Sequence, residues 1–289
     1  MNLGNIIENK VKEYMNKIIK LLQDLTNNSD DKIELLDHNG EAIDKYPTEL
    51  GWYLVPFPKE KGKPYNADNL ATTLRAPFLN DLKFIEARNE AESRWVGTGV
   101  KRDISWRLDI MLWAISHSLR IWNNKSIFVE CGTGRGYMVS AICSYFNWDD
   151  AKPDFYLIDS FSPYVPNMRG EQSEEGTRSF VYSEGDEEIR AYFSKFSRIK
   201  ILKGLIPDVL SQLPKEQICF LHIDLNSQVA ESNALEFLKT KLISGAIVLF
   251  DDYGGFGGDL QAQLHESFAK SMGGRLMTLP TGQAIYFHV

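Results

Sequence analysis

The chain has 289 residues, of which 43% are hydrophobic and 25% charged, as is typical of a globular protein with room for one large or two modest domains. Its net charge of −7 argues against a nucleic-acid partner, because binding to phosphates requires a basic surface. We expect no signal peptide and no membrane span, hence a cytoplasmic protein without a membrane partner. The three cysteines, Cys131, Cys143 and Cys219, are predicted to be buried apolar residues, neither disulfides nor zinc ligands.

Residues 1–95 are predicted to form an N-terminal helix and an irregular arm. Apolar residues recur every three or four positions from Leu3 to Leu25, which predicts an amphipathic helix. Its polar face mixes both charge signs, which favours docking on the rest of the chain or on a second subunit over a membrane surface. Prolines and aromatics in residues 37–80 indicate a packed arm with little regular structure, and Asn80 to Arg94 returns to a helix. We therefore expect a cap or a homo-oligomer contact before a main domain at 96–289.

From Asp103, which is predicted to cap a helix ending near Ile121, helices and strands alternate. Strands are predicted at 126–130, 154–159, 199–203, 218–224, 245–251, 275–279 and 283–288, and helices at 137–146, 185–196, 206–213, 230–240 and 259–272. Such alternation predicts a parallel sheet covered on both faces, while the short link between the last two strands requires an antiparallel pair. The predicted fold is α/β, a doubly wound, mostly parallel, Rossmann-like sheet with a terminal antiparallel strand.

A glycine-rich turn follows the first of these strands. Gly132, Gly134 and Gly136 lie between an apolar strand and an apolar helix, an order that suits a nucleotide-like cofactor at the carboxyl edge of a sheet. An ordinary strand-to-helix connection is the alternative. The spacing lacks the last glycine of the dinucleotide fingerprint, whose place is taken by Tyr137. An acid two residues before the first glycine, Glu130, instead favours S-adenosylmethionine, whose amine a carboxylate can hold.

A second acid, Asp159, ends the next strand, where a ribose hydroxyl pair would lie; a turn or helix cap is the alternative. The candidate cofactor residues are thus Glu130, Cys131, Gly132, Thr133, Gly134, Gly136, Asp159, Ser160 and Gly204.

Two later strands also end in acids, Asp224 in one and Asp251 and Asp252 in the other. Like charges that converge at one sheet edge repel one another unless a cation joins them, and oxygen ligands favour a hard ion such as Mg²⁺ or Ca²⁺. Asp251 and Asp252 can share an ion only if the backbone turns between them. The alternative is that Asp224 caps a helix and the other two acids lie in a turn, satisfied by backbone amides.

Several of these motifs together resemble the macrocin O-methyltransferase family, which methylates sugar hydroxyls of macrolide antibiotics. They are Glu130-Cys131-Gly132, His222-Ile223-Asp224, the strand from Gly245 to Phe250 with Asp251-Asp252-Tyr253-Gly254 after it, Lys203-Gly204, Pro207-Asp208-Val209-Leu210 and Pro280-Thr281-Gly282-Gln283. The resemblance covers roughly residues 95–289. It implies a class I methyltransferase fold, S-adenosylmethionine as the methyl donor, and Mg²⁺ held by Asp224, Asp251 and Asp252.

The chain departs from this family at one place. The family usually reads His-x-Asp-x-Asp-x-Tyr, and this sequence keeps the first acid but has Asn226 and Gln228 for the second acid and the tyrosine. Asn caps a helix as Asp does, so the fold is expected to be unchanged while the acceptor pocket differs.

Our leading hypothesis is metal-assisted O-methyl transfer to a hydroxyl of a small-molecule acceptor, a sugar or polyol. Asp224 is the candidate ligand and base, and His222, on the same strand face, is a candidate helper; a packed core histidine is the alternative for His222. A nicotinamide-dependent oxidoreductase is disfavoured because G-x-G-x-x-G is missing. A methyltransferase-like module without activity is a third hypothesis, motivated by Asn226 and Gln228.

Overall fold

The computed structural model describes residues 65–68, 70–72, 75–96, 102–123, 125–162, 185–254 and 259–289. The chain divides into two compact units, Met1–Ala76 and Pro77–Val289. In the first unit, β1 (Tyr65–Ala67) and β2 (Leu70–Thr72) form an antiparallel pair. The helix predicted over residues 3–25 and the arm before residue 65 lie outside the described residues.

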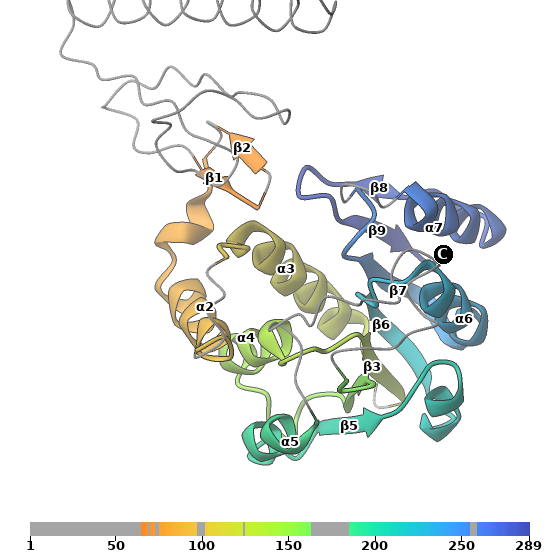
Figure 1. The fold of residues 1–289 in the computed structure, drawn as a ribbon, viewed down its shortest axis with the longest axis horizontal. Helices are drawn as coiled ribbons and strands as arrows, with labels where there is room; N and C mark the ends of the chain where they lie inside the picture. The colour runs from red at the N-terminus through yellow and green to blue at the C-terminus, as the bar shows by residue number, and fades with distance from the viewer. Residues whose placement is uncertain are drawn as a thin grey trace, which may run out of the picture. The chain divides into compact units, whose positions relative to one another are not determined.

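The second unit is built on a seven-stranded sheet with the order β5-β4-β3-β6-β7-β9-β8 (Figure 1). Its strands are β3 (Ser126–Cys131), β4 (Phe155–Asp159), β5 (Ile199–Lys203), β6 (Gln217–Ile223), β7 (Leu242–Phe250), β8 (Met277–Thr278) and β9 (Ala284–Phe287). Neighbours from β5 to β7 pair in parallel, and β9 pairs antiparallel with both β7 and β8. The predicted mostly parallel sheet with an antiparallel strand near its end is confirmed. The antiparallel strand lies between β7 and β8, because the hairpin folds back beside β7.

Helices cover both faces of this sheet (Figure 1). On one face lie α2 (Leu82–Ser93), α3 (Ser105–Ile121), α4 (Tyr137–Phe146) and α5 (Glu187–Phe193), and on the other α6 (Gln228–Leu238) and α7 (Asp259–Ser271). The 3₁₀ helices are η2 (Pro77–Asn80), η4 (Asp208–Gln212) and η5 (Lys239–Lys241). Because side chains alternate along a strand, Phe128 packs in the core under the first group while Val129 packs in the core under the second. In place of the helix predicted at 206–213, the structure has only the short 3₁₀ helix η4.

Helix α2 belongs to the second unit, which begins at Pro77. The boundary predicted from the sequence, at residue 96, places this helix in the arm. Its Phe84, Ala87 and Ala91 are buried in the core that α4 also lines, and the two alanines let the helices approach closely. The main unit therefore extends through α2.

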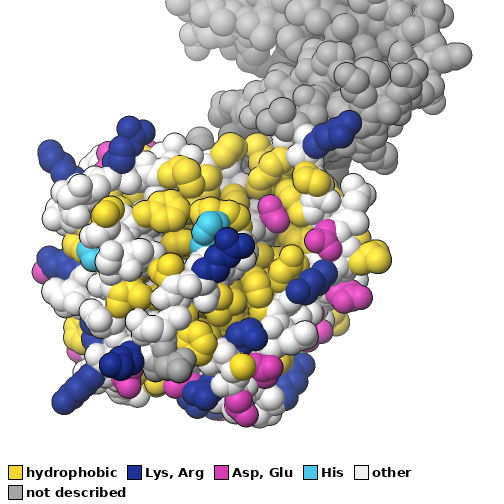
Figure 2. Space-filling view, turned by 180° about the vertical axis from the view of Figure 1, so that it is seen from behind, with side chains coloured by type: hydrophobic (Ala, Val, Ile, Leu, Met, Phe, Trp, Pro, Cys, Tyr) yellow, Lys and Arg dark blue, Asp and Glu magenta, His cyan; other side chains and the backbone are white. Residues whose placement is uncertain are grey.

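Other sequence-based expectations concern burial and the chain's exterior. Cys131, Cys143 and Cys219 are free and buried, as predicted. No helix within the described ranges is long and apolar enough to cross a membrane. Figure 2 shows hydrophobic side chains gathered in the middle of one face, with charged side chains mainly at its margins. The exposed apolar residues include Trp113 of α3 and Phe287 of β9, whose rings meet edge to face.

Candidate active site

The acids picked out from the sequence meet at the carboxyl edge of the sheet. Residue Glu130 of β3 lies opposite His222 of β6, and Ile223 of β6 lies opposite Phe250 of β7. This register places Asp224 and Asp251, the next residues along these two strands, at the ends of neighbouring strands. The prediction that these two acids lie side by side is confirmed.

The glycine-rich turn packs tightly on two sides and is open on a third. A Cβ on Gly132, whose φ is +96°, would lie 1.8 Å from the carbonyl oxygen of Asp224. A Cβ on Gly136 would lie 2.6 Å from the Phe193 ring. At Gly134, by contrast, no atom of the described residues beyond its chain neighbours comes within 4 Å of the Cβ position, although φ is +52°. The turn is thus fixed against β6 and α5 and offers bare backbone at Gly134.

A buried histidine lies between two carboxylates at this edge. His222 has no exposed surface; its Nδ1 is 3.0 Å from Glu130 Oε1, and its Nε2 is 3.9 Å from Asp251 Oδ1, too far for a hydrogen bond. Burial lowers the pKa of His222, but Asp251 and Glu130 outweigh it and raise the pKa to about 10. With this pKa the imidazole is positively charged at neutral pH. Because the ring is fully enclosed, it can influence a ligand only through Glu130 and Asp251.

Asp251 is held by two further residues that the sequence did not indicate as site residues. Arg107 Nη1 of α3 lies 2.8 Å from Asp251 Oδ2, and Gln283 Nε2 donates to Asp251 Oδ1 at 2.8 Å. Burial raises the pKa of Asp251, but His222, Arg107 and Gln283 hold it well below its usual range. Gln283 stood in a motif of the resemblance, whereas Arg107 had no local signal, since it is one charge on a mostly apolar helix.

Asp224, Asp251 and Asp252 form an acidic cluster at this edge. One carboxylate oxygen from each lies within 4.8 Å of the others. The backbone bends at Asp251 and Asp252, which lets both side chains face the same point. Burial and the charges of the neighbouring acids raise the pKa of Asp224, and burial with the charges of Asp251 and Glu231 raises that of Asp252 to about 7. Asn226 Nδ2 donates to Asp224 Oδ1 at 2.9 Å. The asparagine that replaces an acid of the family pattern therefore contacts the cluster directly.

Asp159 ends β4 beside the glycine-rich turn. Its Oδ2 accepts the Gly134 N–H at 2.8 Å and its Oδ1 accepts the Phe161 N–H at 2.7 Å. Burial raises the pKa of Asp159 although these amides lower it. The carboxylate thus holds the open glycine, as a turn cap would.

The other predicted cofactor residues surround this turn. Cys131 is buried, and its carbonyl accepts the Asp224 N–H at 2.9 Å. Gly204 donates its N–H to the Asp159 carbonyl at 3.0 Å. Ser160 Oγ accepts the Ser162 N–H at 3.3 Å. Buried oxygens on two residues, Glu130 Oε2 and Thr133 Oγ1, find no hydrogen-bond partner among the described residues. A buried polar atom without a hydrogen-bond partner lowers the stability of the fold unless a ligand binds to it.

The end of α2 supports the same turn, which the sequence did not predict. Arg94 Nε donates to the carbonyl of Arg135 at 3.1 Å, and Arg94 Nη2 lies 2.9 Å from Glu188 Oε1. The neighbouring Trp95 stacks on Tyr137, the first residue of α4, with ring centroids 4.1 Å apart. This arrangement explains why α2 belongs to the main unit.

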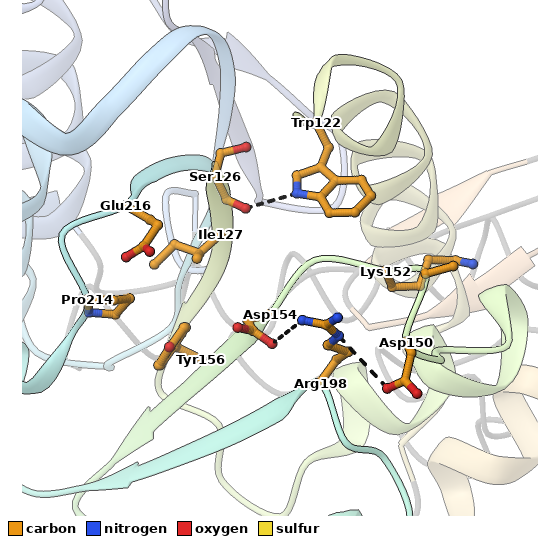
Figure 3. A pocket seen from close by; sticks show the side chains of 11 residues that line it. Trp122, Ser126, Ile127, Asp150, Lys152, Asp154, Tyr156, Arg198, Pro214 and Glu216 are labelled. Atoms are coloured by element: carbon orange, nitrogen blue, oxygen red, sulfur yellow. Dashed lines mark hydrogen bonds and ion pairs between the residues drawn. The ribbon is translucent and has the colours of Figure 1, made fainter. Parts of the chain in front are cut away.

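A hollow of about 540 Å³ lies at the opposite edge of the sheet, where the parallel strands begin (Figure 3). It is lined by Trp122, Ser126, Ile127, Asp150, Ala151, Lys152, Asp154, Tyr156, Arg198, Pro214 and Glu216. Arg198 lies 3.4 Å from Asp154 and 4.0 Å from Asp150, so the hollow's charges largely compensate one another (Figure 3). None of the predicted site residues lines it.

The sheet order, the glycine turn after the first long strand and the acids at the carboxyl edge together define a class I methyltransferase fold. The family model of macrocin-O-methyltransferase (TylF) matches residues 117–271, more than half of the chain. The chain therefore belongs to this family, and it is an O-methyltransferase that uses S-adenosylmethionine. The resemblance inferred from the motifs is confirmed, and the oxidoreductase alternative is rejected.

Solved structures agree on the fold. The chain is similar to the O-methyltransferase NovP, with 21% identity, a TM-score of 0.51, and coverage of 63% of this chain and 79% of that one. It is also similar to the calicheamicin methyltransferase CalS11, with 14% identity, a TM-score of 0.52, and coverage of 72% and 93%. At these identities the likeness concerns the fold alone. No curated protein sequence matches the chain.

Proposed function

We propose that the enzyme methylates a hydroxyl of a small molecule, a sugar or polyol, with the help of a divalent cation. The observation that carries this proposal is the cluster of Asp224, Asp251 and Asp252, whose oxygens lie within 4.8 Å of one another at the edge that carries the glycine-rich turn. Burial, and after it the charges of neighbouring acids, raise the pKa values of Asp224 and Asp252. A cation bound between the acids would offset both effects.

The cofactor fits the glycine-rich turn. Glu130 Oε2 is a buried carboxylate oxygen with no partner among the described residues, which suits the ammonium group of the methionine portion. Asp159 borders the open backbone of Gly134, where the ribose hydroxyls would be held. The turn would therefore offer one acid to the methionine amine of the cofactor and another to its ribose.

The cation would be held by oxygens of Asp224, Asp251 and Asp252, a donor set that suits Mg²⁺. When bound, such an ion lowers the pKa of an acceptor hydroxyl and fixes its position. Arg107 and Gln283 hold Asp251 in place. Because these contacts already occupy both its oxygens, Asp251 is restrained in one orientation before any ligand arrives.

In the transfer itself, a bond forms between the hydroxyl oxygen and the methyl carbon while the carbon–sulfur bond breaks. The products are a methyl ether and S-adenosylhomocysteine, and the hydroxyl proton passes to Asp224. The position of the second family acid carries Asn226, an amide that cannot accept this proton as a base would. His222 acts through Glu130 and Asp251, because its ring is buried between them.

The acceptor class rests on the family, which is named for the methylation of macrocin. NovP is an O-methyltransferase, and CalS11 is a calicheamicin methyltransferase. Asn226 and Gln228 replace two residues of the family pattern at this edge. We therefore propose that the acceptor is not the antibiotic sugar, but that the methyl group is still transferred to a hydroxyl.

The test is an acceptor screen in which S-adenosylhomocysteine formation is followed by mass spectrometry with Mg²⁺ present. We expect one class of sugar or polyol to yield a product one methyl group heavier, and excess EDTA to abolish it. Asp224→Asn should abolish the product while keeping S-adenosylhomocysteine affinity. Full turnover in EDTA would refute the role of the cation, and turnover only on non-hydroxyl acceptors would refute the substrate class.

A further inference from the structure

A second buried pair of a glutamate and a histidine lies behind the acid cluster, on the α6 and α7 side of the sheet. Glu231 of α6 is 1% exposed and His265 of α7 is 0% exposed. His265 Nε2 lies 2.7 Å from Glu231 Oε2, and Gln261 Nε2 donates to Glu231 Oε1 at 3.2 Å. Both oxygens of one buried carboxylate are thus held by a single neighbouring helix.

The ring of His265 contacts both residues that flank the pair Asp251-Asp252. Phe250, directly before the pair, stacks on the imidazole with centroids 4.1 Å apart and an angle of 25°. Tyr253, directly after the pair, lies 6.3 Å from it at 26°. Tyr253 is also tied to the next residue of α7, because its hydroxyl donates to Glu266 Oε1 at 2.7 Å.

This arrangement is unusual for a part of the molecule that only packs. A buried polar pair is seldom better for stability than apolar side chains of similar size. Here it also leaves His265 Nδ1 buried without a hydrogen-bond partner among the described residues. The pair fixes the plane of the imidazole, because the bond to Glu231 determines the orientation of that ring. The imidazole in turn restrains the rings of Phe250 and Tyr253, which stand on either side of the two acids.

We infer that Glu231 and His265 are positioning residues for the Asp251-Asp252 turn, which they hold through Phe250 and Tyr253 so that both carboxylates face Asp224. The inference rests on the proposed role of these acids in binding a cation. Outer partners that orient metal ligands typically change metal affinity by about 10–100-fold when removed.

The experiment measures binding of Mn²⁺ alone, by electron paramagnetic resonance of the free ion, to the full-length protein. His265→Leu should weaken Mn²⁺ binding about 10-fold. Glu231→Gln, which keeps an oxygen for the His265 N–H, should retain most of the affinity. S-adenosylhomocysteine affinity, measured by calorimetry, should be unchanged in both variants because the glycine-rich turn is not altered.

The matched control is Leu238→Ala, which creates a cavity at the opposite end of α6 from Glu231 and also lowers stability. It should lower the melting temperature and leave Mn²⁺ affinity unchanged. If His265→Leu does not fold, Tyr253→Leu is the substitute. It removes the more exposed of the two rings that contact His265 and should also weaken Mn²⁺ binding.

Three outcomes would overturn the inference. Wild-type Mn²⁺ affinity in His265→Leu, or in Tyr253→Leu where that variant replaces it, would make the pair a packing feature only. An equal loss in Glu231→Gln and His265→Leu would show that the orienting bond is not the cause. Absence of Mn²⁺ binding by the wild-type protein would refute the proposed cation itself, and the inference with it.

Discussion

Both edges of the sheet carry clustered acids, yet the two clusters differ in what surrounds them. At the amino edge, Asp150 and Asp154 face Arg198, and all three side chains are at least 30% exposed. At the carboxyl edge, Asp251 is buried and Asp224 and Asp252 are half-buried, and the nearest cations, Arg107 and His222, are directed at Asp251. Water and Arg198 satisfy the first cluster, whereas the second is left with excess negative charge.

The comparison shows that a group of acids indicates a ligand only when burial and a lack of positive partners coincide. The amino edge also has a hollow, but the charges that line it largely compensate one another (Figure 3). The carboxyl edge instead retains buried oxygens without partners among the described residues, such as Glu130 Oε2 and Asp252 Oδ2. These differences support our proposal that methyl transfer takes place at the carboxyl edge.

The largest effect is expected when one acid is neutralised at each edge of the sheet. Asp251→Asn should lower methyl transfer by more than about 100-fold, since even outer partners of a metal site cost roughly 10–100-fold when removed. S-adenosylhomocysteine affinity, measured by calorimetry, should stay within a few-fold of wild type. Asp154→Asn is the matched control at the amino edge and should leave turnover unchanged. Comparable losses in both variants would mean that the edges do not differ in function.

The second prediction separates the cofactor from the cation within the carboxyl edge. Glu130→Gln removes the charge expected to hold the cofactor amine, and a charged hydrogen bond contributes about 1.5–3 kcal/mol. S-adenosylhomocysteine affinity should therefore fall by roughly 10–100-fold, since about 1.4 kcal/mol corresponds to tenfold. Mn²⁺ binding should change far less. Unchanged affinity for the cofactor product would remove Glu130 from the site.

Much of this site could be predicted because its residues end strands. An acid directly after an apolar run, as with Asp224 and Asp251, must lie at the carboxyl edge once the sheet is parallel, so the sequence was sufficient for the cluster. The sequence could not predict Arg107 or the pair of Glu231 and His265. These side chains reach the site from helices, and only tertiary packing shows which helical residue faces which strand end.

The fold, like the site, could be predicted from the sequence only in part. Alternating strands and helices predicted the sheet, and the short link at Pro280–Gln283 predicted the hairpin. The boundary of the main unit was not predictable, because α2 carries few large apolar residues. Ala87 and Ala91 pack closely without giving a strong apolar pattern, so the helix resembles a solvated one in the sequence.

The third prediction compares two glycines of the same turn. Gly134→Val should bring a side chain into the open space expected to receive the cofactor, abolishing S-adenosylhomocysteine binding, while strain at φ +52° costs on the order of 1–2 kcal/mol. Gly132→Ala should instead damage the fold, because its Cβ would lie 1.8 Å from a backbone oxygen of Asp224. Melting temperature and calorimetry distinguish the two effects. Full cofactor-product affinity in Gly134→Val would refute the role of this turn.

The smallest effect is expected from Arg198→Met at the amino edge. Arg198 is 40% exposed and its ion pairs to Asp150 and Asp154 are 4.0 and 3.4 Å long, so their loss should cost no more than about 1 kcal/mol of unfolding free energy. Methyl transfer and Mn²⁺ affinity should be unchanged, because this edge lies at the opposite ends of the strands that carry the acids. The variant nevertheless leaves Asp150 and Asp154 without their cation, which makes the amino edge resemble the carboxyl edge in charge but not in burial. If Arg198→Met acquires Mn²⁺ binding at the amino edge, charge alone decides where an ion binds. If it does not, the lower exposure of the cluster of Asp224, Asp251 and Asp252 is the property that distinguishes the two edges.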